Sequence, residues 1–281
     1  MSDGRRKVMV VGAGTKPRVR EAVERALPVL GADAEIVAID LDESVDLESV
    51  QADLVVVFGG DGAILKAARR LGENLLPVCG VKLGRLGFLA TLTDDDLDAS
   101  LRAVVNGDCT LTSALMLDCR VDRDGATIHR SRAVNDAVVS RGAVSRIISA
   151  DLMIDGEKIT TYNADGVIVS TPLGSTAHCL AAGGPIVEAG AEAMILIPIC
   201  PHTLSNRPVV ISADRQVALE IGEGPEGIAL TMDGQVFQEL RSGDTVSIER
   251  ASRRFDLVRA AGHNYFKTLR DKLGWSGHLR S

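Results

Sequence analysis

The sequence lacks a long apolar run, an excess of positive charge and a paired set of cysteines, and each absence argues against a class of protein. No apolar run approaches the ~18 residues of a membrane-spanning helix, and the first run, residues 8–11, is too short for a signal peptide. The formal net charge of −7 argues against a general nucleic-acid-binding protein. We therefore expect a cytoplasmic globular protein that has neither nucleic acid nor a membrane as a partner.

The cysteines form no recognisable framework. There are five of them, an odd number without a CxxC pair, which indicates a reducing compartment rather than a set of disulfides. The nearest approach to a metal-binding pair is Cys200 followed by His202. Two ligands without further candidates nearby do not make a structural zinc site, so we predict no protein-held metal.

The first ~105 residues alternate between strand and helix patterns. The expected strands cover residues 7–12, 34–40, 53–59 and 75–81, and the expected helices cover residues 18–30, 63–71 and 97–105. Such alternation is typical of a parallel sheet with helices on its faces. We predict an α/β N-terminal domain over residues 1–108.

From about Thr110 the pattern changes to short alternating strands, with tight-hairpin signals at Asp155-Gly156 and Asp233-Gly234. We predict a mainly antiparallel β domain over residues 109–261. The tail is helical again and contains three of the eight aromatic residues, which favours a helix docked on the protein body. This helix, within residues 262–281, is expected to complete the first domain.

The most informative segment is a strand (54–58), the turn Gly59-Gly60-Asp61-Gly62 and a helix directly after it. Glycines allow close approach of the backbone to a ligand, and the start of a helix favours an anion. A carboxylate beside an anion is costly unless it has a task. The turn therefore suggests phosphoryl chemistry with Asp61 acting on a hydroxyl. The alternative is a tight turn in which Asp61 caps the helix.

Three further segments contain polar residues in glycine-rich or strand-like surroundings. Residues 80–89 carry Lys82 and Arg85 among glycines, as a phosphate-facing loop would. Residues 165–178 lead a strand into a Ser/Thr/Gly turn and a short helix opening at Ser175 or Thr176, whose hydroxyls and N–H groups can hold a ribose or a phosphate. Asn135-Asp136 is either a sugar-binding pair or a bulge or hairpin corner.

A dinucleotide fingerprint is also incomplete in this chain. Gly12-Ala13-Gly14 follows the first strand, but proline occupies position 17, where the fingerprint requires glycine. Asp40 could mimic the ribose-binding acid of a Rossmann dehydrogenase. An ordinary strand-to-loop turn is the favoured interpretation.

Taken in order, the motifs GGDG, GVKLGRLGFLA, VND, DGVIVSTPLGSTA with AAGGPIV, PICPHTLSNRP and MDGQ resemble those of the NAD kinase family, over nearly the whole chain. The resemblance implies the two-domain NAD kinase fold. It also implies phosphorylation of the adenosine 2′-hydroxyl of NAD by ATP, or by polyphosphate, with Mg²⁺ or another divalent cation, in a homodimer or homotetramer. Asp61 matches the catalytic aspartate. The implied ligand contacts are Gly59, Gly60, Gly62, Lys66, Arg85, Phe88, Asn135, Asp136, Arg146, Asn163, Asp165, Thr176, Ala177, His178, Cys179, Leu180, Ala181 and Gln235.

The chain departs from the family pattern at several of these positions. Lys82 stands where asparagine is usual, and Asp136 where glutamate is usual. His178 replaces a tyrosine that stacks on adenine, Ala181 replaces a serine, and Leu173 replaces a small hydroxyl residue. We expect these changes to affect NAD affinity or the preference between NAD and NADH, and to leave the chemistry intact.

Two other functions remain as alternatives, a lipid kinase that has the same GGDG turn and a sensor that binds the same nucleotide. A lipid kinase would associate with vesicles, but the chain lacks a basic amphipathic stretch that would hold it on a membrane. A non-catalytic nucleotide sensor would bind NAD without turnover, and it would gain nothing from a carboxylate beside a phosphate.

Overall fold

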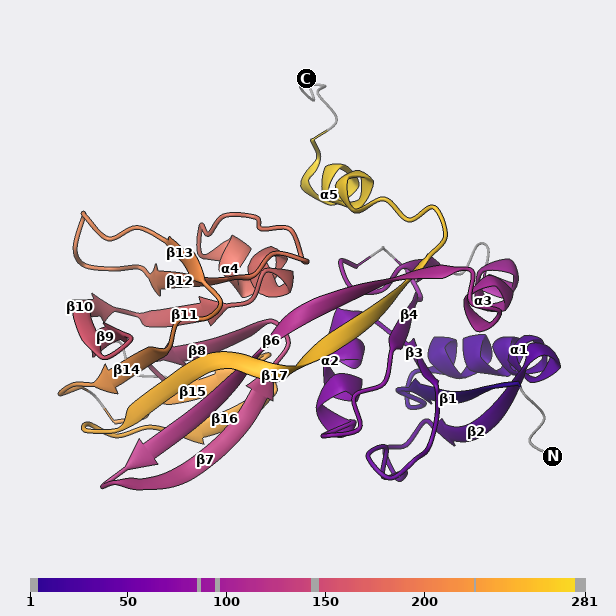
Figure 1. Ribbon diagram of the computed structural model, residues 1–281, viewed down its shortest axis with the longest axis horizontal. Helices are drawn as coiled ribbons and strands as arrows, with labels where there is room; N and C mark the ends of the chain where they lie inside the picture. Colours follow the sequence, from indigo (N-terminus) through magenta and orange to yellow (C-terminus); the bar gives the residue numbers. More distant parts are fainter. Residues whose placement is uncertain (1–4, 85–86, 94–96, 143–146, 225, 276–281) are drawn as a thin grey trace. The chain divides into compact units, whose positions relative to one another are not determined.

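The computed structural model describes residues 5–84, 87–93, 97–142, 147–224 and 226–275, and the chain divides into two compact units (Figure 1). Unit 1 contains Met1–Thr112 and Phe255–Ser281, and unit 2 contains Ser113–Arg254. The chain leaves unit 1 within the long strand β6 (Cys109–Arg123) and returns within β17 (Thr245–Ala260). The domain boundaries expected from the sequence, at 108 and 261, stay a prediction.

Unit 1 is built on a parallel sheet. Its strands follow the order β2-β1-β3-β4, and the far edge of β4 pairs with β5 and with the end of β17. All of these pairs are parallel, as the alternating pattern predicted. The whole sheet is mixed because β17 also pairs antiparallel with β14 in unit 2. The strands named here are β1 (Arg6–Gly12), β2 (Ala34–Asp40), β3 (Leu54–Phe58), β4 (Val78–Lys82), β5 (Leu92–Thr93) and β14 (Val217–Ile221).

Helices cover both faces of this sheet. Alternate apolar residues of β1 and β3 share one buried core with α1 (Pro17–Asp33) and α3 (Leu97–Val105). On the other face, α2 (Asp61–Arg70) places Ile64 against Gly80, where a Cβ would overlap the Ile64 side chain. The three helices predicted from periodicity are confirmed. α2 starts two residues before the predicted start because Gly60, in an extended conformation, is its N-cap.

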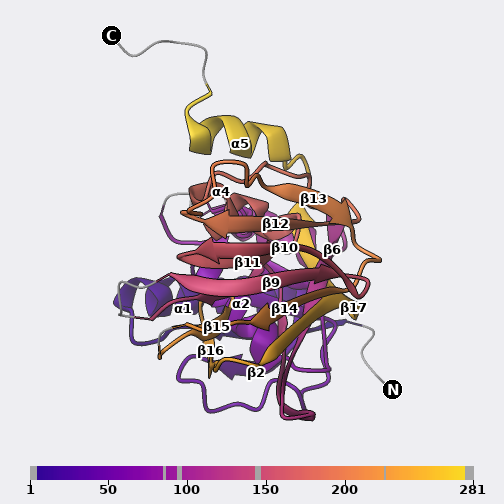
Figure 2. The same ribbon diagram turned by 90° about the vertical axis from the view of Figure 1, so that its left-hand side faces the viewer.

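Unit 2 consists of two sheets packed over one core. The first has the order β13-β12-β11-β8-β15-β16, with antiparallel pairing throughout. Figure 2 shows its strands β13, β12 and β11 one below another. The second contains β10, β9, β14 and β17, with β6 and β7. Buried side chains of both sheets meet in one cluster, so the predicted antiparallel β domain is confirmed. The remaining strands are β7 (Ala126–Ala133), β8 (Asp136–Ser140), β9 (Ile148–Ile154), β10 (Glu157–Ala164), β11 (Gly166–Ser170), β12 (Ala193–Ile199), β13 (Val209–Ser212), β15 (Ala229–Met232) and β16 (Val236–Glu239).

The two expected hairpin turns are present. Asp155 and Asp233 have φ of 51° and 52°, and the glycine after each also has a positive φ, 80° and 64°. Two successive residues with positive φ match the twist of antiparallel strands, which explains the Asp-Gly sequence at both places. These turns join β9 to β10 and β15 to β16.

The helical segments outside the α/β pattern are short. β11 leads into a 3₁₀ turn, η2 (Leu173–Thr176), and then into α4 (His178–Ala181), so the helical region opens slightly before the predicted Ser175. The tail forms α5 (Tyr265–Leu273), as predicted. The aromatic rings that suggested docking are not buried, since Phe266 and Trp275 are 59% and 57% exposed. The buried residues of this helix are Thr268 and Leu269.

Candidate functional site

Asp61 is held by backbone N–H groups from a distant segment. The residue opens α2, but its carboxylate turns away from the helix and accepts hydrogen bonds from the N–H groups of Phe88, Leu89 and Ala90 at 2.9, 3.3 and 3.3 Å. The alternative role of helix cap is therefore wrong. A carboxylate offers about four acceptor directions. Three are used here, which leaves room for one more donor, such as a hydroxyl.

Glycine at position 87 makes this arrangement possible. A Cβ at Gly87 would overlap the Asp61 carboxylate, so only glycine lets the segment approach this closely. At Gly62 a Cβ would meet nothing within 4 Å, so the space beside the turn is open. Gly59 donates its N–H to the carbonyl of Val81 at 2.9 Å, which fixes the turn at the carboxyl edge of the sheet. In parallel α/β sheets, ligands bind at this edge.

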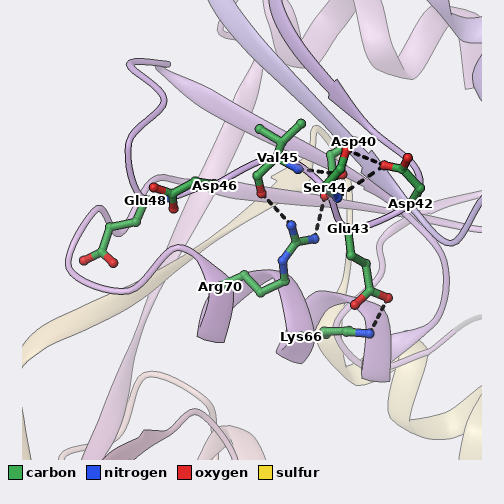
Figure 3. Close-up of polar contacts among 9 residues, drawn as sticks. All are labelled: Asp40, Asp42, Glu43, Ser44, Val45, Asp46, Glu48, Lys66 and Arg70. Atoms are coloured by element: carbon green, nitrogen blue, oxygen red, sulfur yellow. Dashed lines mark hydrogen bonds and ion pairs between the residues drawn. The ribbon is translucent and has the colours of Figure 1, made fainter.

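The turn has a cation beside it, Lys82 of the glycine-rich segment 80–89. A Cβ at Gly60 would lie 2.7 Å from the ammonium nitrogen of Lys82. Within the described part of the chain, no carboxylate forms an ion pair with Lys82. Lys66, the predicted nucleotide-binding lysine, forms an ion pair with Glu43 instead (Figure 3). Arg85, the other predicted cation, lies outside the described residues.

Asp40 has a structural task in the loop that follows β2. Its buried carboxylate pairs with Arg70 at 2.5 Å and accepts the N–H of Val45 at 3.3 Å (Figure 3). The neighbouring Gly14 donates its N–H to the carbonyl of Leu41 at 2.8 Å. A Cβ at Gly14 would overlap Leu41. The structure thus supports the ordinary strand-to-loop turn and not a dinucleotide-binding fingerprint.

A buried arginine near Asp61 was missed by sequence reasoning. Arg259, 5% exposed, donates to the Phe88 carbonyl at 3.3 Å and to the Thr112 hydroxyl at 3.2 Å. Burial lowers the pKa of its guanidinium, while electrostatic interactions with Tyr265 and Asp61 act in the opposite direction. An arginine at the end of a strand-like run carries no local pattern that would reveal this contact.

A second cluster lies in unit 2, at the bend between β7 and β8. Asn135 and Asp136 are buried, with 7% and 4% exposure. The side-chain oxygen of Asn135 has no hydrogen-bond partner among the described residues. Burial, and then the negative charge of Asp233, raises the pKa of Asp136 to about 7. The corner that the alternative predicted is present, but an unsatisfied buried acceptor costs about 1–3 kcal/mol and favours the ligand-binding interpretation.

The bend is clamped on its carbonyl side by the strand end before η2. The Thr171 hydroxyl donates to the Val134 carbonyl at 2.7 Å, and the Thr171 N–H donates to the Asn135 carbonyl at 2.8 Å. A Cβ at Gly174 would overlap the Asn135 backbone, so glycine is required there. Ser175, a candidate for ligand contact, is buried and bonds to the carbonyls of Pro172 and Val187, so its hydroxyl has a structural role.

The other predicted contact residues are spread over unit 2. Asp165 pairs with Arg141 at 3.0 Å, a partner that the sequence did not suggest. Asn163 lies in β10, and its carbonyl accepts the His202 N–H at 2.9 Å. Arg146 lies outside the described residues.

The η2–α4 segment carries the last group of predicted contacts. Thr176, Ala177 and Leu180 are half-buried, while His178 and Ala181 are exposed. Cys179 is fully buried, and burial raises the pKa of its thiol to about 11. Gln235 follows the Asp233-Gly234 turn and donates its N–H to the Met232 carbonyl at 2.9 Å. Contact of these residues with NAD stays a prediction.

Within the described ranges, no group of three or more His, Cys, Asp or Glu residues is placed to hold a metal ion. None of the helices described has the length and apolar character needed to cross a membrane.

Comparison with known proteins gives a consistent result over both units. The models of the ATP-NAD kinase N-terminal domain and the ATP-NAD kinase C-terminal domain match residues 8–109 and 134–260. The NAD kinase of Rhodopirellula baltica is 43% identical over 273 residues, which cover 97% of this chain and 88% of that protein. The NAD kinase of Geobacter metallireducens is 45% identical over 224 residues, covering 80% and 79%.

Two solved structures of similar fold contain nucleotide ligands, NADH in one and ATP in the other. Yeast NADH kinase complexed with NADH matches with a TM-score of 0.88 and 25% identity, covering 99% of this chain and 90% of that one. An NAD kinase from Archaeoglobus fulgidus in complex with ATP matches with a TM-score of 0.77 and 27% identity, covering 95% and 98%.

Proposed function

The chain belongs to the NAD kinase family, and we propose that it transfers the γ-phosphate of ATP to the adenosine 2′-hydroxyl of NAD with Asp61 as the orienting carboxylate. The observation that carries the role of Asp61 is its set of three backbone hydrogen bonds, which fix both carboxylate oxygens and leave one acceptor direction open. The ribose hydroxyl would occupy that direction.

The proposed chemistry depends mainly on orientation. Phosphoryl transfer passes through a loose transition state, so the attacking hydroxyl need not lose its proton early. Asp61 would accept the hydrogen bond of the hydroxyl and aim its oxygen at the γ-phosphorus. As the new P–O bond forms, the bond from the γ-phosphorus to the bridging oxygen breaks, ADP leaves, and Asp61 takes up the proton of the hydroxyl.

Positive groups around the turn suit the phosphate donor. The N-terminal end of α2 and the ammonium of Lys82 would face the phosphates, where they would stabilise negative charge as it develops. Mg²⁺ typically takes one or two carboxylates and several phosphate oxygens or waters. Because the described residues hold no multi-ligand metal cluster, and the one open acceptor direction of Asp61 is assigned to the ribose hydroxyl, a divalent cation would be held mainly by the donor phosphates. Such an ion would neutralise phosphate charge.

The acceptor nucleotide would be recognised in unit 2. The free side-chain oxygen of Asn135 and the buried carboxyl of Asp136 are acceptors suited to ribose hydroxyls and the adenine amino group. Lys66 would contact the nucleotide only after leaving Glu43. Both partners of this ion pair are about half exposed, at 40% and 52%, so separating them costs little, roughly 0–1 kcal/mol.

The partners proposed for the protein are NAD and ATP, with polyphosphate as a second donor. Similar proteins were solved with NADH and with ATP, which supports this choice of ligands. A homodimer or homotetramer and a cytoplasmic location remain predictions from the family resemblance.

One assay tests the proposal and separates it from its rivals. The purified protein is incubated with NAD or NADH and with Mg-ATP or polyphosphate, and NADP is measured with a coupled NADP-specific dehydrogenase. We expect NADP from NAD and ATP. Binding of NAD without product from either donor would favour a nucleotide sensor, and phosphate transfer to diacylglycerol in vesicles would favour a lipid kinase.

A further inference from the structure

The carboxylate of Asp233 binds three consecutive backbone N–H groups of the Val134–Asp136 bend. The distances are 2.9 Å from Val134, 2.7 Å from Asn135 and 3.3 Å from Asp136. In return, the N–H of Asp233 donates to the Asp136 carbonyl at 3.0 Å. One side chain, ~100 positions away in sequence, thus fixes the backbone from which Asn135 and Asp136 project.

We propose that Asp233 is a positioning residue for the NAD substrate: it holds the bend so that the side chains of Asn135 and Asp136 meet the adenosine ribose. The proposal rests on the function proposed above, because it takes these two side chains as NAD contacts. Asp233 itself acts through the backbone and does not need to touch the nucleotide.

The hydrogen bonds of the bend are divided in a way that supports this role. Asp233 satisfies its N–H groups, and Thr171 and Ser170 satisfy its carbonyls at Val134 and Asn135. The backbone of the bend is therefore held from both sides, while the Asn135 side-chain oxygen has no partner within the described part of the chain. A fixed backbone with an unsatisfied buried side chain is what a preorganised ligand site requires.

Holding the bend requires the carboxylate of Asp233, although its negative charge disfavours the ionised form of Asp136. A carboxylate has about four acceptor directions and can receive three N–H groups, whereas an amide oxygen can receive about two. The negative charge of Asp233, added to the effect of burial, keeps the pKa of Asp136 near 7. From α4, the Cys179 thiol also faces Asp136, but its pKa of about 11 leaves it neutral in this range.

This arrangement links NAD binding to pH. An ionised Asp136 can accept hydrogen bonds on both of its carboxylate oxygens. The protonated form has an O–H group, which must donate a hydrogen bond itself. The KM for NAD should therefore fall as the pH rises through about 7 in the native protein. Replacing Asp233 by a neutral residue removes one of the two causes that raise the pKa of Asp136. The fall in the KM for NAD should therefore occur at lower pH in such a variant.

The test compares Asp233→Asn with the native protein across pH 5.5–9. We expect the KM for NAD at pH 8 to rise roughly 10-fold, because the bend loses part of its support. The KM for ATP and kcat at saturating NAD should change by less than about 3-fold, since Asp61 and its surroundings are untouched. The pH at which the KM for NAD falls should be lower in the variant.

A matched control is available in the other Asp-Gly turn. Asp155 has nearly the same φ, and its carboxylate accepts the Gln216 N–H at 2.9 Å and pairs with Arg215. Asp155→Asn therefore removes the same group from the same type of turn, away from the bend. It should leave the KM for NAD and its pH dependence unchanged.

A second variant guards against a simple folding defect. Asp233→Glu keeps the negative charge but moves the carboxylate oxygens by one methylene. The KM for NAD should therefore rise, while the pH at which this KM falls should be the same as in the native protein. Unchanged KM and pH dependence in Asp233→Asn would overturn the proposal. So would a parallel loss of kcat, ATP affinity and thermal stability, which a merely structural role would produce.

The failure of this inference can be distinguished from failure of the proposed function. If the native protein forms no NADP with any donor, the proposed function fails. Calorimetric titration of NAD into the native protein and Asp233→Asn then still tests the inference, since equal dissociation constants at pH 8 would overturn it and a roughly 10-fold weaker variant would support it.

Discussion

Arg259 donates a hydrogen bond to the carbonyl oxygen of Phe88 at 3.3 Å, while the N–H of the same Phe88 donates to Asp61 at 2.9 Å. The peptide groups around Phe88 are thus held between a buried cation and the proposed catalytic carboxylate. Lys272 of α5 adds a contact with the side chain of Phe88, with its ammonium 5.6 Å from the centre of the ring. Asp61 is therefore positioned by residues from three separate parts of unit 1.

We predict that Arg259→Met lowers kcat by ~10-fold or more, because the segment that orients Asp61 loses a buried support. Arg259→Lys should be intermediate, since lysine keeps the charge but not the planar fork. Steady-state kinetics with varied ATP and NAD will measure this effect. The control is Arg254→Met, which also removes a bond from β17 to a backbone carbonyl, that of Ser113 at 2.9 Å. Equal kinetics in the two methionine variants would contradict the prediction.

Replacing the Asp61 carboxylate should affect turnover far more than binding. In Asp61→Asn we expect kcat to fall by ~10² or more, because the amide neither accepts a proton nor carries the charge. The dissociation constant for NAD, measured by calorimetry, should stay within about 3-fold of the native value, because recognition of NAD is assigned to other residues. Asp42→Asn is a suitable control, since that carboxylate lies in an exposed loop, where it accepts hydrogen bonds from the N–H and the hydroxyl of Ser44. Retained turnover in Asp61→Asn would remove Asp61 from the mechanism.

Lys82 should contribute to the binding of the phosphate donor. Its ammonium lies against Gly60, so Lys82→Asn should raise the KM for ATP about 5-fold, and that for polyphosphate more, with a smaller change in the KM for NAD. The control Lys158→Asn removes a lysine that pairs with Asp151 in unit 2. A donor KM that responds equally to both substitutions, or to neither, would argue against this role of Lys82.

The sequence could predict the features that depend on local pattern. Periodicity located β3, the turn and α2, and the two Asp-Gly hairpins followed from backbone conformation alone. The partners of Asp61 could not be found in this way, because the N–H groups of residues 88–90 and Arg259 reach it only through pairing of distant strands. Lys66 illustrates the same limit: its place off the apolar face of α2 was predictable, but its ion pair with Glu43 was not.

The unit 2 cluster was predictable only in part. The Asn135-Asp136 pair was noticeable because polar residues interrupt a strand-like run. The support from Asp233 lies 97 to 99 positions away, and no local pattern indicates that its carboxylate serves this bend rather than its own turn. The Asp233-Gly234 sequence predicted the conformation of the turn correctly. The hydrogen bonds from the bend at residues 134–136 to the Asp233 carboxylate could be found only in the folded structure.

The raised pKa of Asp136 predicts how the stability of the ligand-free protein depends on pH. The carboxyl has an ordinary pKa of 3.8 in the unfolded chain and about 7 in the folded protein, so between these values the folded state binds more protons. The contribution of this group to stability is therefore present below pH 3.8 and is lost as the pH rises to about 7. The difference corresponds to about 4 kcal/mol at most.

Asp136→Asn should remove this pH dependence, because the amide does not ionise. Urea unfolding without ligand measures the free energy of unfolding of both proteins at each pH. The difference, variant minus native, should be more favourable to the variant at pH 8 than at pH 5.5. Asp155→Asn provides the contrast. Hydrogen bonding to Gln216 and then to Arg215 lowers the pKa of Asp155, so that carboxyl is ionised at both pH values and its loss should have the same effect at each. A stability difference for Asp136→Asn that does not change between pH 5.5 and 8 would mean that Asp136 is ionised throughout, and the proposed pH dependence of NAD binding would then lose its cause.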